Sequence, residues 1–356
     1  MKATQKDSTK MNSPEQLADP KAARVVSDLN VGKPLLRCCL DPSGKTLFTA
    51  GQDTRIWQVP LEETKDAETK MAALTGHESW VFGLAMHPNG ELLLSGGGDG
   101  NLIWWSLSDG PATQLRKIHA HQAWIRDVAI SVDGKVVATA GNDQLVKLWN
   151  VEDGRLLNTL KGHEFDIYRI AFHPDGERLI SGDLTAHIKC WQIDSGKMLR
   201  ELHAPTLHRI DKNHNLHLGG TRALAFDSNG KQLAVSGLRA APNYLGGEVQ
   251  PGNVIFDFES GDIVKEQKTK EDLSTVPWES FFDGDDMLVV STGGKADGHL
   301  FFWKTDAEQE FHSFALPSAA RDLAMDRQRH HLVTAHYDGH LRITSLQSEP
   351  PESEVS

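Results

Sequence analysis

Short apolar runs separated by polar turns recur along the chain. Within residues 121–160, the runs IRDVAIS, KVVATAG, LVKLWNV and RLLNTL are separated by the tripeptides VDG, NDQ and EDG. Runs of this length, rich in Val, Ile and Leu and bounded by Gly and Asp, are typical of β-strands joined by tight turns. We find no long 3.6-residue period of the kind that indicates an amphipathic helix. The pattern predicts units of four antiparallel strands.

The unit repeats along the sequence. The third run of each unit ends at an equivalent position, which is aromatic in six of the seven units: Trp57, Trp105, Trp149, Trp191, Phe256, Trp303 and Thr344. Their spacings are 48, 44, 42, 65, 47 and 41 residues, and five of these lie close to the roughly 40–45 residues of a propeller blade. We therefore predict an all-β fold, a seven-bladed β-propeller with four-stranded antiparallel blades.

Further motifs carry a family resemblance. Gly76-His77 and Gly162-His163, with the variant Ala120-His121, precede the first strand of a unit, and Asp99, Asp143 and Asp297 lie six residues before their Trp. The chain resembles the WD-repeat (β-transducin repeat) family over residues 22–346. The resemblance is strongest in blades 2 to 4 and weaker in blades 5 to 7.

The resemblance implies structural tetrads, in which imidazole, hydroxyl, carboxylate and indole satisfy one another inside a blade. These are His77, Ser95, Asp99 and Trp105 in blade 2, His121, Thr139, Asp143 and Trp149 in blade 3, and His163, Ser181 and Trp191 in blade 4, where Thr185 stands at the Asp position. A His, a Ser and an Asp are also the ingredients of a catalytic triad. Because the same set recurs blade after blade, we interpret it as a structural fastener and predict no catalytic residue.

The ring has to close. Residues 23–29, ARVVSDL, resemble the fourth strand of other units, whereas the last unit ends near Leu346 after its third strand. We predict that this N-terminal strand completes the last blade and removes an exposed sheet edge. The predicted organisation is a disordered segment over 1–21, the propeller over 22–346 and an acidic tail over 347–356.

Blade 5 departs from the repeat through two insertions, residues 204–220 and 238–252. The second and fourth strands of a blade end on the same side of the disc, so both insertions should rise from one face. The first contains His203, His208, His214 and His217. This His-rich loop, 203–217, supports an alternative function, that of a metal-dependent sensor or enzyme, although its spacings match no established zinc pattern.

A candidate partner surface lies on that same face. Trp80 and Trp124 occupy equivalent positions after the Gly-His or Ala-His pairs of adjacent blades. An aligned column one strand step further in contains Arg126, Tyr168, Arg222 and Arg321. Aromatic residues and Arg dominate binding hot spots, and in the family this rim resembles the usual peptide-binding surface. The other interpretation of Trp80 and Trp124 is packing between blades.

Composition narrows the function further. The net charge of −12 argues against a nucleic-acid binder, which needs a basic footprint. There is no run of 18 apolar residues that would predict a membrane span, and the N-terminus lacks the apolar core of a secretory signal. Three cysteines without a C-x-x-C favour a reducing compartment. We predict a cytoplasmic scaffold or adaptor for a protein or peptide partner, with no cofactor and no enzymatic activity.

Overall fold

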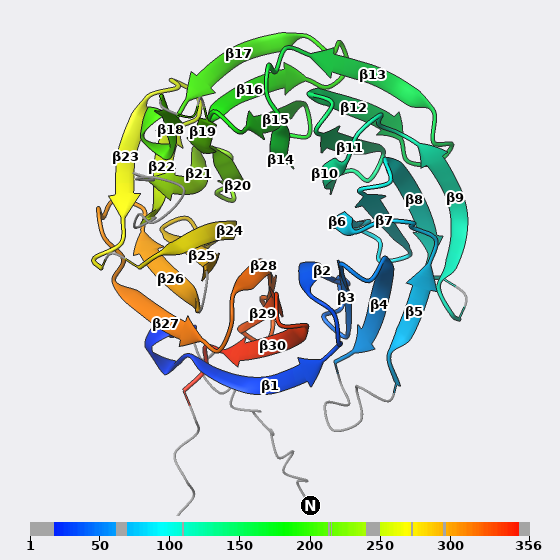
Figure 1. Ribbon diagram of the computed structural model, residues 1–356, viewed down its shortest axis with the longest axis horizontal. Coiled ribbons are helices and arrows are strands. Elements are labelled where there is room, and N and C mark those ends of the chain that lie inside the picture. Colours follow the sequence, from blue (N-terminus) through cyan, green and yellow to red (C-terminus); the bar gives the residue numbers. More distant parts are fainter. Residues whose placement is uncertain are drawn as a thin grey trace, which may run out of the picture.

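Each predicted repeat forms one four-stranded antiparallel sheet in the computed structural model of the chain (Figure 1), which describes residues 18–61, 70–108, 110–212, 214, 216–239, 250–271, 273–294 and 297–348. Seven such sheets surround a central axis, and the predicted seven-bladed propeller is confirmed. Among the described residues, no helix is long and apolar enough to span a membrane.

The first four blades follow the chain from the innermost strand outward. Their strands are β2 (Leu35–Leu40), β3 (Thr46–Gly51), β4 (Arg55–Pro60), β5 (Ala72–Thr75), β6 (Val81–Met86), β7 (Leu92–Gly97), β8 (Asn101–Ser106), β9 (Thr113–His119), β10 (Ile125–Ile130), β11 (Val136–Gly141), β12 (Leu145–Asn150), β13 (Leu156–Lys161), β14 (Ile167–Phe172), β15 (Arg178–Asp183), β16 (His187–Gln192) and β17 (Met198–His203).

Blades 5 and 6 keep this order, and blade 7 takes its outer strand from the N-terminus. Their strands are β20 (Thr221–Phe226), β21 (Gln232–Arg239), β22 (Gln250–Asp257), β23 (Ile263–Lys268), β24 (Thr275–Asp283), β25 (Met287–Gly294), β26 (Gly298–Lys304), β27 (His312–Leu316), β28 (Ala320–Asp326), β29 (His331–His336), β30 (His340–Ser345) and β1 (Arg24–Asn30).

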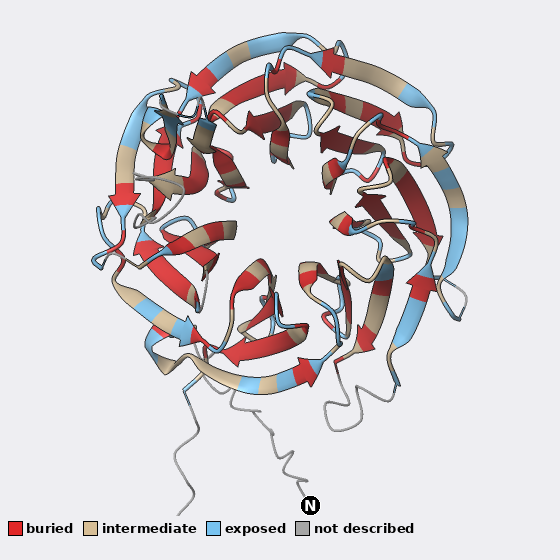
Figure 2. Ribbon diagram, in the orientation of Figure 1, coloured by how far each residue is buried: buried red, intermediate tan, exposed pale blue. Residues whose placement is uncertain are grey.

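The hydrophobic core is divided among the spaces between neighbouring blades. Val146 and Leu148 of blade 3, for example, pack in one cluster with Leu179 and Trp191 of blade 4. The two middle strands of each blade are largely buried, whereas the outermost strands are mostly exposed or half-buried, with at most one buried residue each (Figure 2). A single sheet would leave one apolar face in water, so each blade depends on the next.

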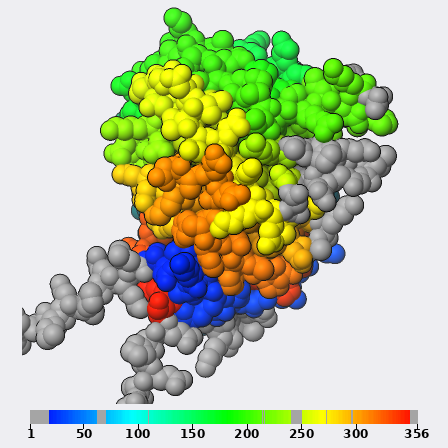
Figure 3. Space-filling model, turned by 90° about the vertical axis from the view of Figure 1, so that its left-hand side faces the viewer, coloured from blue at the N-terminus to red at the C-terminus, as the bar shows by residue number. Residues whose placement is uncertain are grey.

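The N-terminal strand closes the ring. Strand β1 pairs antiparallel with β30, from Arg24 opposite Ser345 to Asn30 opposite His340. Figure 3 shows the blue N-terminal residues beside the orange residues of blade 6. Part of the segment predicted to be disordered has defined structure. Pro20–Ala22 form the 3-10 helix η1, and the backbone N–H of Asp19 donates to the carbonyl of Leu346 at 2.8 Å.

The first insertion of blade 5 forms a small hairpin. After the 3-10 helix η3 (Pro205–Leu207), strand β18 (His208–Asp211) pairs with β19 (Leu216–Gly219). The second insertion lengthens β21 and β22, and its residues 240–249 lie outside the described residues. Strand β19 contacts β21, so the two insertions meet. The ring of His217 lies 4.5 Å from that of Phe165, which belongs to the connection between blades 3 and 4.

Candidate partner-binding site

Every innermost strand carries an irregularity at the same place. The pairing of the first strand with the second slips by one residue in all seven blades, and one residue per blade bulges out of the ladder. A bulge re-aims a side chain and leaves its backbone groups unpaired. The seven bulged residues, which we call the bulge ring, are Leu36, Phe82, Arg126, Tyr168, Arg222, Trp278 and Arg321.

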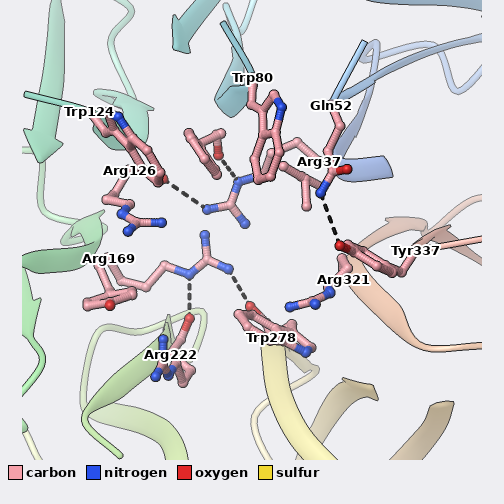
Figure 4. Close-up of a pocket in the computed structure, with 13 residues that line it drawn as sticks. Arg37, Gln52, Trp80, Trp124, Arg126, Arg169, Arg222, Trp278, Arg321 and Tyr337 are labelled. Carbon is pink, nitrogen blue, oxygen red and sulfur yellow. Dashed lines mark hydrogen bonds between the residues drawn. The ribbon is translucent and has the colours of Figure 1, made fainter. Parts of the chain in front are cut away.

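The bulge ring lines one cavity of about 230 Å³ on the axis of the propeller (Figure 4). The cavity opens on the face that carries the connections between blades and the turns between second and third strands, which we call the loop face. Gln52 and Tyr337 reach it from two of those turns, and they are joined by a 3.2 Å hydrogen bond from the Gln52 amide to the Tyr337 hydroxyl.

All six candidate partner-binding residues lie around this cavity: Trp80, Trp124, Arg126, Tyr168, Arg222 and Arg321. Their role in binding stays a prediction. Trp80 and Trp124 are 41% and 43% exposed. Each also contacts Phe82, with ring centroids 6.1 Å and 5.3 Å away. The two indoles therefore pack across the junction of blades 2 and 3 and still present apolar surface to solvent.

Arginine and aromatic side chains alternate around the wall. The guanidinium of Arg126 lies 5.1 Å from the ring centres of both Phe82 and Tyr168. That of Arg222 lies 4.5 Å from Tyr168 and 5.7 Å from Trp278. The guanidinium of Arg321 lies 4.0 Å from Trp278 and 4.7 Å from the ring of Tyr337. Stacking on ring faces stabilises the cations.

Two further arginines form the floor of the cavity. Arg37 donates to the carbonyls of Phe82 and Arg126, and Arg169 donates to those of Arg222 and Trp278 (Figure 4). These four carbonyls belong to bulged residues. Buried backbone acceptors need a partner, so the two guanidiniums complete four of the seven bulges and tie innermost strands together across the axis.

Three carboxylates surround the floor arginines. Arg37 lies 3.4 Å from Asp127, 3.7 Å from Glu279 and 3.3 Å from Asp322, while Arg169 lies 3.6 Å from Asp127 and 3.1 Å from Glu279. All five residues directly follow a bulged residue, and we call them the floor cluster. Burial raises the pKa of Asp127 and of Asp322 to about 7, although Arg37 lowers both. Burial also raises the pKa of Glu279.

The wall arginines differ from the floor arginines in their partners. Among the described residues, no carboxylate lies within ion-pair distance of Arg126, Arg222 or Arg321. Arg126 donates from Nε to the amide oxygen of Asn142 at 2.7 Å, whereas Nε of Arg222 and of Arg321 is buried without an acceptor. Burial lowers the pKa of all three guanidiniums, and a neighbouring arginine lowers each one further.

The tetrads of blades 2 and 3 have the implied connectivity. In blade 3, His121 lies 2.8 Å from Asp143 through Nδ1 and 2.7 Å from the hydroxyl of Thr139 through Nε2. The indole N–H of Trp149 donates to the same hydroxyl at 2.9 Å. In blade 2, His77, Asp99, Ser95 and Trp105 repeat this chain at 3.1, 2.8 and 2.9 Å.

In blade 4 the structure shows a tetrad carboxylate at a position that the spacing did not predict. Asp183, not Thr185, holds His163, with 2.7 Å between its carboxylate and the imidazole Nδ1. The imidazole and the indole of Trp191 both bond Ser181, at 2.7 and 2.8 Å. The Thr185 hydroxyl instead donates to Asp183 at 2.8 Å.

The physical reason lies in the backbone position of Asp183. In the strand pairing it stands where blade 2 has Gly97. A Cβ added at Gly97 would lie 2.6 Å from both His77 Nδ1 and an Asp99 oxygen. A side chain growing from this position therefore reaches the imidazole directly. In blade 4 the carboxylate comes from the end of the second strand, two residues before the expected place.

We expect Asp183→Asn to destabilise the protein more than Thr185→Val. Burial alone would raise the pKa of the Asp183 carboxyl, but its bonds to His163 and Thr185 outweigh this and hold the pKa below its ordinary value. Asp183→Asn weakens the charged hydrogen bonds to both His163 and Thr185, which are worth about 1.5–3 kcal/mol each, whereas Thr185→Val removes only one of them. Urea unfolding midpoints measure both. Equal losses, or a larger loss for the threonine variant, would show that the aspartate is not the tetrad member.

Blades 5 to 7 use other polar contacts. In blade 5, the hydroxyl of Ser236 donates to Asn253 at 2.7 Å, and Asn253 donates to Gln267 at 3.1 Å. In blade 6 the indole N–H of Trp303 is buried without a partner, so Asp297 builds no tetrad there despite its spacing. Blade 7 joins the hydroxyl of Thr334 to His336 at 2.7 Å.

The His-rich loop shows a pair instead of a cluster. His208 Nε2 and His217 Nδ1 are 2.9 Å apart and their rings stack, while His214 bonds Asp211 at 2.9 Å. His203 stacks on His187 with ring centroids 4.2 Å apart. Across the described residues, no three His, Cys, Asp or Glu side chains are arranged to hold a metal ion. No observation here favours the metal-dependent alternative.

Comparison with known proteins agrees with this geometry. The family "WD domain, G-beta repeat" matches residues 68–106, 112–150 and 154–192, each of which contains the first three strands of blade 2, 3 or 4. A seven-bladed ring with tetrads in these three blades defines a WD-type propeller. Three repeats of the chain match the WD-repeat family, and the described residues form a seven-bladed β-propeller. Members of this family are typically protein-interaction scaffolds.

Individual relatives match over short segments. Histone acetyltransferase type B subunit 2 of Candida glabrata is 30% identical over 105 residues, which are 29% of this chain and 24% of that protein. Nuclear distribution protein PAC1 of Meyerozyma guilliermondii is 42% identical over 52 residues, which are 14% of this chain and 10% of that protein. The chain thus spans a quarter or less of the length of these curated relatives.

Proposed function

We propose that this propeller is a scaffold or adaptor without chemistry of its own, which binds a segment of a protein or peptide partner on the loop face. The observation that carries the proposal is the cavity on the axis, because one hollow gathers Trp80, Trp124 and the bulge ring. Concave sites with apolar walls and a few convergent polar groups are the usual form of binding sites.

The composition of this site supports recognition of a polypeptide. Trp, Tyr and Arg are the residues enriched at binding hot spots, and the rim and wall are built almost entirely from these types. The titratable groups that resemble catalytic residues are engaged elsewhere, since the imidazoles of His77 and His121 each bond both a carboxylate and a hydroxyl inside a blade.

We propose the cytoplasm as the place of action. All three cysteines are free thiols, and Cys38 and Cys190 are buried. Burial raises the pKa of each thiol, which keeps the protonated form and disfavours oxidation.

We expect the double variant Trp80→Ala/Trp124→Ala to lose partner binding while its melting temperature falls by only a few degrees. Truncating a central aromatic anchor typically costs at least about 2 kcal/mol of binding, so the pair should weaken capture well over tenfold. The measurement is affinity capture from source cells with quantitative mass spectrometry, together with thermal melts.

A matched control tests the location of the site. Leu115→Ala/Val132→Ala removes two exposed apolar side chains that do not line the cavity and should capture the same proteins as the native chain. Retained capture by the tryptophan variant would contradict the proposal. A large fall in its melting temperature would show that the indoles act in the core.

A further inference from the structure

We infer that the cavity on the loop face receives an oxyanion group, a carboxylate or a phosphate, carried by a side chain of the polypeptide partner. The inference rests on the proposed function and specifies the chemistry of the group that enters. It starts from the three wall arginines, Arg126, Arg222 and Arg321, whose charge the protein leaves uncompensated at short range.

On the floor of the cavity, the charge of the arginines is balanced by carboxylates of the same chain. Arg37 and Arg169 share three carboxylates and donate to four backbone carbonyls. The wall arginines occupy the bulge positions of three other strands, β10, β20 and β28. They have aromatic rings as neighbours and no carboxylate within ion-pair distance among the described residues. The acidic neighbour that acts on Arg126, Asp166, lies beyond that distance.

The wall also holds donors without acceptors. Nε of Arg222 and Nε of Arg321 are both buried, and neither has a hydrogen-bond partner. A guanidinium presents its donors in a planar fork that matches a carboxylate or phosphate. An oxyanion placed between these side chains would accept hydrogen bonds from donors that have no partner. It would also offset the repulsion among the three positive charges.

The shape and charge of the whole molecule favour a single group on a polypeptide. The chain carries a net charge of −12, which repels an extended polyanion such as nucleic acid or an anionic membrane. The three wall arginines line one cavity of about 230 Å³. Such a hollow takes one anionic group, and the exposed indoles of Trp80 and Trp124 beside it provide an apolar shelf for flanking residues.

The test uses the full chain and pools of immobilised peptides with degenerate flanks and one fixed central residue. The fixed residues are Glu, phosphoserine and phosphotyrosine, with Gln, Ser, Tyr and Lys as their uncharged or opposite counterparts. We expect the acidic or phosphorylated pools to bind about tenfold more strongly than their counterparts, because hydrogen bonds to charged groups are worth at least that factor. The pool that binds best distinguishes carboxylate from phosphate.

Variants of the wall arginines test whether the preference for acidic or phosphorylated peptides arises at the cavity. Arg222→Gln/Arg321→Gln should bind all pools alike, whereas Arg116→Gln should keep the native preference. Arg116 is a matched control because it also stacks on an indole, 5.4 Å from the ring of Trp104, but lies away from the cavity. Should the double variant fail to fold, the native preference must still weaken at high salt, as a screened charge interaction does.

The outcomes separate the two proposals. Native binding with no preference for acidic or phosphorylated pools would overturn the oxyanion inference and leave the proposed function standing. Binding that favours Lys pools would overturn it as well. If no pool of any composition binds the native chain, the oxyanion inference and the peptide-binding function fail together.

Discussion

Deleting residues 1–30 is expected to prevent formation of a stable monomeric propeller. The deletion removes the whole pairing between β1 and β30 and leaves β30 as an open edge. It removes Leu29, which is 4% exposed in the cluster between blades 7 and 1. It also removes Asp28, which bonds His340 at 2.6 Å and Arg342 at 3.1 Å. Loss of a core leucine alone typically costs about 2–5 kcal/mol, a large share of the 5–15 kcal/mol that stabilises most domains.

Thermal melts and size-exclusion chromatography measure this effect. The expected result is a melting temperature lower by at least about 10 °C, since 1 kcal/mol shifts it by roughly 2–4 °C in a chain somewhat shorter than this one, and association through the open edge. A chain lacking only residues 1–17 keeps every described contact of β1 and should melt like the native protein.

A rearranged chain provides a second control. Moving residues 22–31 behind Leu346 through a short turn would give blade 7 the same strand order along the chain as the other six blades. We expect this variant to recover the native melting temperature. A truncated chain that melts like the native one, or a rearranged chain that fails to recover, would contradict closure by β1.

Replacing Arg37 with Met should be the most destabilising single substitution in the floor cluster. The change leaves Arg169 as the remaining cation beside the three carboxylates of the floor cluster. It also removes the hydrogen-bond donor of the carbonyls of Phe82 and Arg126. Removing one partner of a buried ion pair costs about 3–5 kcal/mol. The free energy of unfolding in urea measures the loss.

The pH dependence of the Arg37→Met variant provides an internal check. Burial already raises the pKa of Asp127 and Asp322 to about 7 in the native protein, and loss of the cation should raise both further. A carboxyl whose pKa is higher in the folded than in the unfolded state stabilises the fold at low pH and loses this contribution as the pH rises through the folded value. The variant should therefore gain stability, relative to the native protein, as the pH falls from about 8 to 6.

Arg327→Met serves as the matched control. Its guanidinium lies 3.3 Å from Asp283 but is 62% exposed, so the loss should stay within about 1 kcal/mol. A similar small loss for Arg37→Met would show that the floor cluster does not hold the inner strands together.

The fold could be predicted because one position per repeat is nearly constant. The aromatic residue at the end of each third strand fills the space between blades, as Trp191 does between blades 3 and 4, and this need recurs around the ring. Strand β1 was also predictable, because a last repeat that lacks its fourth strand leaves an edge to be covered. The 3-10 turn at Pro20–Ala22 carries no periodic signal and was assigned to disorder.

The candidate site was predicted in part, and the bulges explain what was missed. Arg126, Tyr168, Arg222 and Arg321 stand out as a column of unusual residue types. Phe82 and Trp278 occupy the same column, and the alignment of repeats was sufficient to add them. Tyr337 comes from a turn that has no counterpart in the column, and only the folded ring brings it to Arg321.

The floor cluster was missed for a different physical reason. Residues adjacent in a regular strand point to opposite faces, so a column next to Arg126 is expected to turn away from the site. The bulge breaks this alternation and lets both Arg126 and Asp127 approach the axis. Charged residues at Arg37, Asp127 and Arg169, in positions where an inner strand is otherwise apolar, were the available signal.

Asp183 shows that a fixed spacing from the Trp is not sufficient to locate the tetrad carboxylate. Spacing from Trp191 puts Thr185 at the Asp position, which predicts a blade 4 tetrad without its carboxylate. The turn itself is the same as in blades 2 and 3, because Ala186 has a φ of 59° where Gly100 has 73° and Gln144 has 65°. The carboxylate is instead carried two residues earlier, by Asp183. Hydrogen-bond geometry in the folded blade decides which residue serves, and a repeat alignment cannot register such a shift.

Site-specific photo-crosslinking in source cells tests the central claim most directly. A photoreactive amino acid in place of Gln52 lies at the cavity on the loop face, whereas the same group in place of Val132, exposed in the turn after β10, lies on the opposite face of the disc. A partner protein crosslinked from position 52 and absent from position 132 is the predicted result. Crosslinks from position 132 alone, or from neither position, would contradict a partner-binding site on the axis of this propeller.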